Sequence, residues 1–141
     1  SGMFLFAEVG CAECHRPPRF ESETYANRHV VELPDVDDDG RAESTGQNQD
    51  MGLFRTPTLR NVRETGPYFH NGSVDNLEEA VAHELAEQRA LGIARMLEPE
   101  EEDDLVRFVH HALIDASREQ FRPASVPSGL DIPRDGDRLF R

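Results

Sequence analysis

Two cysteines and a histidine near the start of the chain constrain its fold more than any other feature. Cys11, Cys14 and His15 form the arrangement C-x-x-C-H, and the chain has no further cysteine. Thiols three positions apart can reach the two vinyl groups of one haem, while the adjacent imidazole can bind its iron. The motif therefore predicts one covalently attached haem c, with His15 as the proximal iron ligand.

Two other chemistries of a cysteine pair compete with this prediction. A thioredoxin-like redox pair requires a strand-to-helix context, and a zinc site requires two further thiol or imidazole ligands at matching spacing. Ligand count alone leaves zinc open, because five other histidines are present: His29, His70, His83, His110 and His111. Haem c is attached outside the cytoplasm to exported proteins, so the haem prediction also implies a periplasmic or extracellular location.

The charge of the chain restricts its partners. With 28 acidic and 15 basic residues, the formal net charge is -13. Repulsion from phosphate groups argues against nucleic acid and anionic membranes. We expect instead a basic redox protein or an adjoining haem domain, with solubility as the plain alternative explanation of the charge. No run of residues approaches the ~18–20 apolar residues that span a bilayer, so no membrane insertion is expected.

Hydrophobic periodicity predicts three helices. Residues 3–9 are expected to form a helix that leads into the haem motif. Asp75 followed by Glu78 predicts a second helix start, and Gly92 its end. A third helix is predicted from Pro99, with acidic residues at the positive end of its dipole. The expected buried faces are Leu77, Ala80, Val81 and Leu85 in the second helix, and Leu105, Phe108, Val109, Ala112 and Leu113 in the third.

The rest of the chain predicts loops. Residues 17–49 are rich in Pro, Asp, Gly, Ser and Asn without a sustained period, and no strand is predicted. Only 37% of the 141 residues are hydrophobic, so a buried porphyrin would complete a thin core. We expect a mostly α, cytochrome c-like helical domain over residues 1–116, with long loops wrapped around one covalent haem. Residues 117–141 are expected to form a C-terminal extension that packs on the surface or links onward.

Two runs of sequence resemble one family closely. They are LFRTPTLRNV at positions 53–62 and TGPYFHNG at positions 65–72. Together with the motif before them and the helix after them, they resemble the second haem domain of bacterial dihaem cytochrome c peroxidases. The same domain occurs in related dihaem enzymes that oxidise protein side chains. The resemblance covers roughly residues 3–115 and identifies a superfamily rather than one reaction.

The resemblance implies electron transfer more firmly than catalysis. In that family the second domain carries the electron-entry haem, while peroxide chemistry occurs at a separate haem in the first domain. This chain has a single C-x-x-C-H motif. The leading hypothesis is therefore an electron-transfer c-type cytochrome domain that relays single electrons. The alternative is a haem peroxidase or a small-ligand-binding sensor with an open or weakly held sixth iron position.

The sixth iron ligand departs from the family pattern. The resemblance places a distal Met, or a Tyr in the maturation enzymes, at the position that Glu84 occupies here. Helix register favours Glu84 as the ligand, because a neighbouring residue points about 100° away. The chemistry of a low-spin haem favours the imidazole of His83 instead. Met96 and an open or water-filled position complete the alternatives.

The resemblance also implies groups around the haem edge. The loop that contains Pro57 passes over the haem in this family, so the flanking Arg55 or Arg60 is expected to pair with a haem propionate. His70 could line the haem edge or cap a turn. Family carbonyls at Thr65 and Pro67 help to bind calcium, together with ligands from another domain. Calcium is therefore possible here but not expected.

An acidic run raises a second calcium question. Residues 35–40 resemble the start of a calcium-binding loop, but position twelve of that loop would be Gly46 instead of the bidentate Glu that it requires. The run is therefore expected to be a solvated acidic turn. Ser1 and Gly2 ahead of Met3 resemble a cloning remnant, so we expect further sequence upstream.

Overall fold

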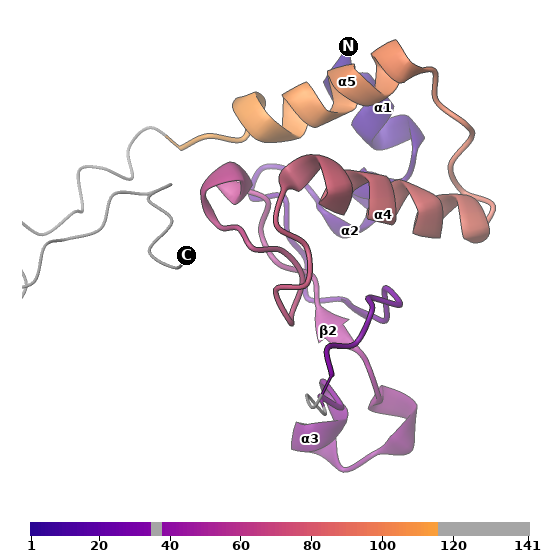
Figure 1. Cartoon of the computed structure of the whole chain (residues 1–141), viewed down its shortest axis with the longest axis vertical. Helices are drawn as coiled ribbons and strands as arrows, with labels where there is room; N and C mark the ends of the chain where they lie inside the picture. The colour runs from indigo at the N-terminus through magenta and orange to yellow at the C-terminus, as the bar shows by residue number, and fades with distance from the viewer. Residues whose placement is uncertain (35–37, 116–141) are drawn as a thin grey trace, which may run out of the picture.

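The computed structural model describes residues 1–34 and 38–115 of the chain (Figure 1). These residues are mostly helical, as the sequence predicts. In chain order the elements are α1 (Gly2–Glu8), α2 (Cys11–Cys14), β1 (Tyr25–Ala26), α3 (Ala42–Thr45), η1 (Asn48–Asp50), β2 (Phe54–Arg55), η2 (Val62–Glu64), α4 (Leu77–Ala90), α5 (Pro99–Arg107) and η3 (Phe108–Ala112). The expected extension at residues 117–141, residue 116, and residues 35–37 of the acidic run lie outside the described residues.

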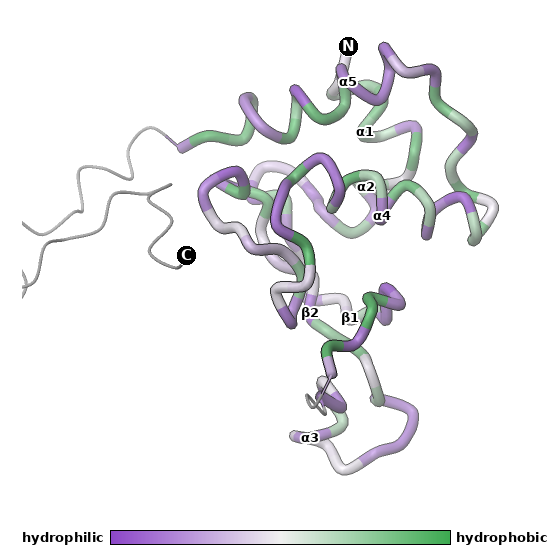
Figure 2. The backbone as a smooth tube through the Cα atoms, viewed as in Figure 1, coloured by the Kyte–Doolittle hydropathy of each residue, from purple (hydrophilic) through white to green (hydrophobic). Residues whose placement is uncertain are grey.

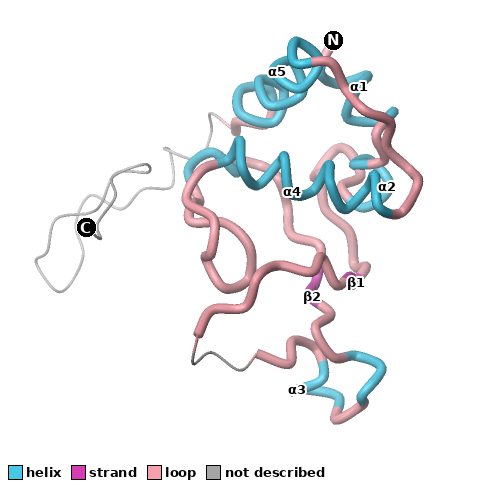
Figure 3. Tube along the Cα trace, turned by 45° about the vertical axis from the view of Figure 1, so that its right-hand side comes forward, coloured by secondary structure: helices cyan, strands magenta, loops and turns pink. Residues whose placement is uncertain are grey.

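The longer helices lie at one end of the molecule and the loop that contains α3 at the other (Figure 3). Helix α1 packs along α5, and α4 lies beneath them in the view of Figure 1. Hydrophobic and hydrophilic residues alternate along α4 and α5 (Figure 2), as expected of helices with one buried side. The core is contributed mainly by these helices: Leu5, Phe6 and Val9, then Leu77 and Leu85, then Leu105, Val109 and Leu113.

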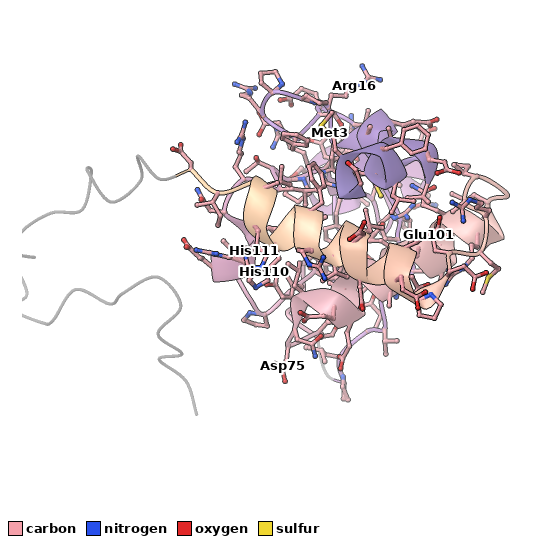
Figure 4. The ribbon with its side chains drawn as sticks, turned by 90° about the horizontal axis from the view of Figure 1, so that it is seen from above. Met3, Arg16, Asp75, Glu101, His110 and His111 are labelled. Atoms are coloured by element: carbon pink, nitrogen blue, oxygen red, sulfur yellow. The ribbon has the colours of Figure 1, made fainter. Side chains whose placement is uncertain are left out.

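The predicted helix from residue 75 is present, but its first capping residue is one position later than expected. Asn76 is the N-cap of α4, and its side chain accepts a hydrogen bond of 2.8 Å from the backbone N–H of Glu79. Asp75 is exposed and extends outward (Figure 4). Either residue type can cap a helix, so the sequence pattern could not separate them. Gly92 ends the helix region at a φ of 72°.

Helix α5 begins at Pro99, as predicted, and continues into the wider π-helical turn η3. Glu98 and Glu101 form a capping box at its start. The predicted stripe is correct for Leu105, Val109 and Leu113, which are all buried. It is wrong for Ala112, which is exposed, because the buried positions follow a strict spacing of four residues through the wider turn.

Residues 17–49 form loops with short turns, as predicted, but they also contain one strand. Residues Tyr25 and Ala26 pair antiparallel with Arg55 and Phe54. The expectation of no strand is therefore wrong, since two-residue strands are too short for alternation to reveal them. Within the described ranges, no helix is long and apolar enough to cross a membrane.

His110 and His111 were expected at the surface. The side chains lie near the end of the last helix (Figure 4), with ring centroids 4.3 Å apart. His111 is exposed, as predicted, whereas His110 is half-buried and its Nδ1 is buried without a hydrogen-bond partner in the described part of the chain.

The central buried leucine of α5 provides a test of the core. Leu105 is 1% exposed, so Leu105→Ala should lower the free energy of unfolding of the haem-loaded protein by about 2–5 kcal/mol. Guanidinium denaturation measures the change. Leu91→Ala is the matched control, because Leu91 is 62% exposed and the expected change is under about 0.5 kcal/mol. Equal effects of the two substitutions would contradict the placement of the core.

A surface ion-pair cluster predicts a dependence on pH. Arg95 bonds Glu8 of α1 and Glu101 of α5, with Nε–Oε1 and Nη1–Oε2 distances of 2.9 and 2.7 Å. The guanidinium of Arg95, followed by the backbone N–H of Glu98, lowers the pKa of Glu101 from 4.5 to about 2. A carboxylate with a depressed pKa stabilises the folded state above its unfolded pKa and loses that contribution as pH falls through its folded pKa.

Arg95→Gln should therefore lower the melting temperature at pH 7 and have progressively less effect as pH falls from 4.5 to 2. Thermal unfolding of both proteins across this pH range measures the difference. Arg107→Gln is the control, because the exposed Arg107–Asp104 pair lies within one helix and such pairs contribute little. A gap between wild type and Arg95→Gln that is the same at pH 7 and pH 2 would count against this ion-pair cluster.

Candidate haem site

The C-x-x-C-H motif lies in a tight turn directly after α1. Gly10 has a φ of 85°, and a Cβ at this position would lie 2.6 Å from Cγ2 of Ile93. The turn therefore favours glycine for both conformation and space. It starts α2, whose single turn carries Cys11 and Cys14, and His15 follows as the C-cap. Residues three apart lie on one face of a helix, so both thiols are presented together.

Both thiols and the His15 imidazole line one cavity of about 540 Å³. This volume falls within the range of ~300–1,000 Å³ that is usual for small-molecule and cofactor sites. Its wall is largely apolar and is built from several elements: Phe6, Leu59, Leu77, Val81, Leu85 and Val109. Such a wall with a few polar groups suits a macrocycle that is apolar over most of its surface.

The imidazole of His15 is held in one orientation. Its Nδ1 lies 3.1 Å from the carbonyl oxygen of Phe20 and 3.1 Å from that of Pro57. Because carbonyls only accept, Nδ1 carries the proton, and Nε2 is left as the metal-binding nitrogen. Burial lowers the pKa of His15, which favours the neutral ring that binds metals. Pro57 thus acts at this site through its backbone.

The environment of Cys11 favours a protonated thiol. Burial, and then the carboxylate of Glu84, raise the pKa of Cys11 to about 12. Redox-active and metal-binding cysteines instead have lowered pKa values, because the thiolate is the reactive form. The pair also follows helix α1 rather than a strand, so the context of a thioredoxin-like motif is missing. No group of three or more potential metal-ligating residues occurs among residues 1–34 and 38–115.

The structure separates the candidates for the sixth ligand. Glu84 lines the cavity from α4. His83 does not line it, since Nε2 lies 2.7 Å from the carbonyl oxygen of Arg28 and its ring packs edge-on against Phe69. Met96 is 72% exposed and lies outside the cavity wall. Among the three named side chains, the fold brings Glu84 alone to the cavity, as the helix register indicated.

Sequence analysis missed one charged residue of the cavity. Arg28 lines it and contacts Glu84, with Nε 2.8 Å and Nη2 2.6 Å from Oε2. The two residues are 56 positions apart, and Arg28 lies in a loop without periodicity. Its neighbours in the sequence carried no signal that could have identified it.

The structure also distinguishes the two arginines near Pro57. Arg55 lines the cavity, although its guanidinium bonds both oxygens of Glu23 at 3.2 and 2.7 Å. Arg60 does not line it and donates two hydrogen bonds to the carbonyl of Pro18. The structure therefore brings Arg55, and not Arg60, to the position where a propionate partner was expected.

Three other residues of the family-like runs also line the cavity. They are Thr65, Pro67 and His70. The ring of His70 stacks on Phe54, with centroids 3.7 Å apart.

Comparisons with known proteins identify the family. The cytochrome c551 peroxidase of Nitrosomonas europaea is 31% identical over 136 residues, which cover 94% of this chain and 39% of that protein. The cytochrome c551 peroxidase of Pseudomonas aeruginosa is 34% identical over 114 residues, which cover 77% of this chain and 32% of that protein. The chain belongs to the dihaem cytochrome c peroxidase family.

The MauG branch of this peroxidase family is similar as well. The methylamine utilization protein MauG of Methylorubrum extorquens is 34% identical over 85 residues, covering 58% of this chain and 23% of that protein. A crystal structure of a MauG-like protein associated with microbial copper homeostasis matches with a TM-score of 0.64 and 26% identity, over 82% of this chain and 46% of that one. No family model matches the chain.

Membership of the dihaem cytochrome c peroxidase family confirms the predicted resemblance, the cytochrome c-like helical fold and haem c as the type of cofactor. The chain spans less than half the length of each of these relatives. The cavity fits haem c, because its two thiols, its oriented imidazole and its apolar wall match the groups that the cofactor needs.

The turn that presents the haem motif can be tested at Gly10. Gly10→Ala combines the cost of a positive φ with a contact 2.6 Å from Ile93. Gly46→Ala has a φ of 66° with nothing within 4 Å, so it should cost only the ~1–2 kcal/mol of the left-handed conformation. We expect Gly10→Ala to lower the free energy of unfolding by more than this control. Adding Ile93→Ala should remove the excess, and an unchanged excess would argue against the close contact.

Proposed function

We propose that this chain is an electron-transfer c-type cytochrome domain that relays single electrons through one covalently bound haem c. The observation that carries the proposal is that Cys11, Cys14, His15 and Glu84 all line one largely apolar cavity. The haem supplies a one-electron couple, because its iron changes between the ferric and ferrous states. The protein residues determine how tightly the iron is held and which ligands reach it.

Cys11 and Cys14 hold the cofactor in this proposal through two thioether bonds. Each thiol adds across one vinyl group, so that a sulfur–carbon bond forms and the thiol hydrogen moves to the other vinyl carbon. No electrons are gained or lost in this addition. The position of both cysteines on the single turn of α2 supports this role.

His15 and Glu84 are the proposed axial ligands. His15 would bind through Nε2, because Nδ1 donates to backbone carbonyls. Glu84 would bind in place of the Met or Tyr that the family resemblance predicts at its position. A carboxylate ligand stabilises ferric iron, so the reduction potential should be lower than that of a Met-ligated haem. Arg55 is the proposed propionate partner, since it lines the cavity.

The proposed location is the periplasm or the cell exterior, where haem c is attached. The proposed partner is a basic redox protein or an adjoining haem domain. The net charge of -13 supports the first, because opposite charges steer association. The length of the relatives, which exceeds that of this chain by more than twofold, supports the second.

A second candidate function is a haem peroxidase or a small-ligand sensor. Two observations favour it: relatives are named cytochrome c peroxidase, and the Glu84 carboxylate already has a protein partner in Arg28. If that pair kept Glu84 from the iron, the sixth position would be open. Cyanide or carbon monoxide would then shift the absorption spectrum, whereas a relay haem with two protein ligands should be unaffected.

Haem attachment is tested by intact mass and absorption of protein exported to the periplasm. We expect the mass of the polypeptide plus one haem, and the loss of that haem in the Cys11→Ala/Cys14→Ala double variant after denaturation. A single Cys14→Ala variant should retain the haem through one thioether. A colourless wild-type protein with the mass of bare polypeptide would contradict the whole proposal.

The sixth ligand is tested by the ferric absorption spectrum at neutral pH. Glu84→Gln should change the spectrum from low-spin towards high-spin, because a carboxamide is a poor ligand for ferric iron. His83→Ala and Met96→Ala are the controls and should leave the spectrum as in wild type, since neither side chain lines the cavity. If only His83→Ala changes the spectrum, the Glu84 assignment is wrong.

A further inference from the structure

Arg28 contacts Glu84 in an unusual way. A guanidinium commonly binds the two oxygens of a carboxylate with two parallel hydrogen bonds. Here Nε at 2.8 Å and Nη2 at 2.6 Å both contact Oε2. In the described part of the chain, Oε1 of Glu84 has no hydrogen-bond partner. One oxygen is therefore held by the protein, and the other is left available.

The Arg28 side chain is fixed by the same helix that carries Glu84. Nε2 of His83 lies 2.7 Å from the backbone carbonyl oxygen of Arg28. One turn further along α4, Oε2 of Glu87 lies 2.8 Å from Nδ1 of His29. Helix α4 thus anchors the backbone of Arg28, its side chain and the next residue. The guanidinium is held in place instead of reaching Glu84 by chance from a mobile surface chain.

The burial of the pair gives this arrangement a physical purpose. Side chains of Arg28 and Glu84 are only 22% and 35% exposed. A lone carboxylate in an apolar cavity is costly, and removing one partner of a buried pair leaves the other charge uncompensated. Arg28 compensates the charge of Glu84 while leaving Oε1 unoccupied. An exposed ion pair that served only the surface would need neither feature.

We infer that Arg28 is a positioning residue for the sixth iron position, which holds Oε2 of Glu84 so that Oε1 alone is presented to the iron. The inference rests on the proposed function, because it requires haem in the cavity and Glu84 as its ligand. Arg28 acts through Glu84 and has no contact with the iron itself. Without it, the carboxylate can rotate away from the cavity, and an added ligand can take the vacated position.

Binding of imidazole to the ferric, haem-loaded full chain tests this role. Imidazole is neutral, so the loss of a positive charge does not by itself change its approach, as it would for cyanide. We expect Arg28→Gln to bind imidazole about tenfold more tightly than wild type, which corresponds to ~1.4 kcal/mol. Arg28→Lys should lie in between, since it keeps the charge but loses the two-nitrogen contact. Arg107→Gln, which removes the same charge at the surface, should match wild type.

A double variant decides whether Arg28 acts through Glu84. If it does, Arg28→Gln/Glu84→Gln binds imidazole no more tightly than Glu84→Gln alone, because the ligand that Arg28 positions is already gone. Multiplying effects would instead mean that Arg28 acts independently, and would overturn the inference. Arg28→Lys also keeps the test valid if Arg28→Gln does not fold.

The outcomes separate this inference from the proposed function. If Glu84→Gln increases imidazole affinity and neither Arg28 variant does, the inference fails while Glu84 stands as the ligand. If Glu84→Gln leaves both the spectrum and imidazole affinity as in wild type, Glu84 is not the ligand, and the proposed ligation and the role of Arg28 both fail. Thermal unfolding of each variant identifies any change that comes from loss of the fold.

Discussion

The orientation of one imidazole is the interaction on which the rest of this structure depends. Nδ1 of His15 lies between the carbonyls of Phe20 and Pro57, which are 5 and 42 residues away along the chain. The Phe20 carbonyl also accepts a hydrogen bond from the backbone N–H of Leu59. These contacts join the cysteine motif to the loop that resembles the peroxidase family. They also fix the tautomer of the ring, so that a metal-binding nitrogen and the wall of the cavity are set by the same bonds.

Long loops enclose the cavity with little regular structure, and side-chain contacts at separated positions hold them. The amide of Asn71 donates to the carbonyl of Val31, and Arg55 binds Glu23 beside the short strand pair. Helix α4 adds its own contacts to the loop at residues 28–29. A loop-rich and acidic chain can be ordered in this way because each contact joins distant segments, although each one alone contributes little.

The carboxylate at position 84 sets this chain apart within its family. The resemblance implies a Met or a Tyr there, and a buried carboxylate differs from both in charge. It needs a compensating cation in an apolar setting, and Arg28 provides one. The pair therefore forms one unit, in which a change of ligand and a charged neighbour belong together. As proposed, this unit would favour the ferric state and would adapt the haem to a lower potential than that of a Met-ligated electron-entry haem.

The sequence by itself determined the features that depend on local spacing. The positions of Cys11, Cys14 and His15 specified the cofactor, and apolar periodicity located α1, α4 and α5 to within a few residues. Helix register also distinguished Glu84 from His83. Only the tertiary structure decided that Arg28 faces Glu84, that Arg55 rather than Arg60 reaches the cavity, and that Asn76 caps α4. The first two depend on contacts between segments far apart in the sequence, which leave no periodic trace in a loop, and the third depends on a choice between two adjacent residues with the same capping chemistry.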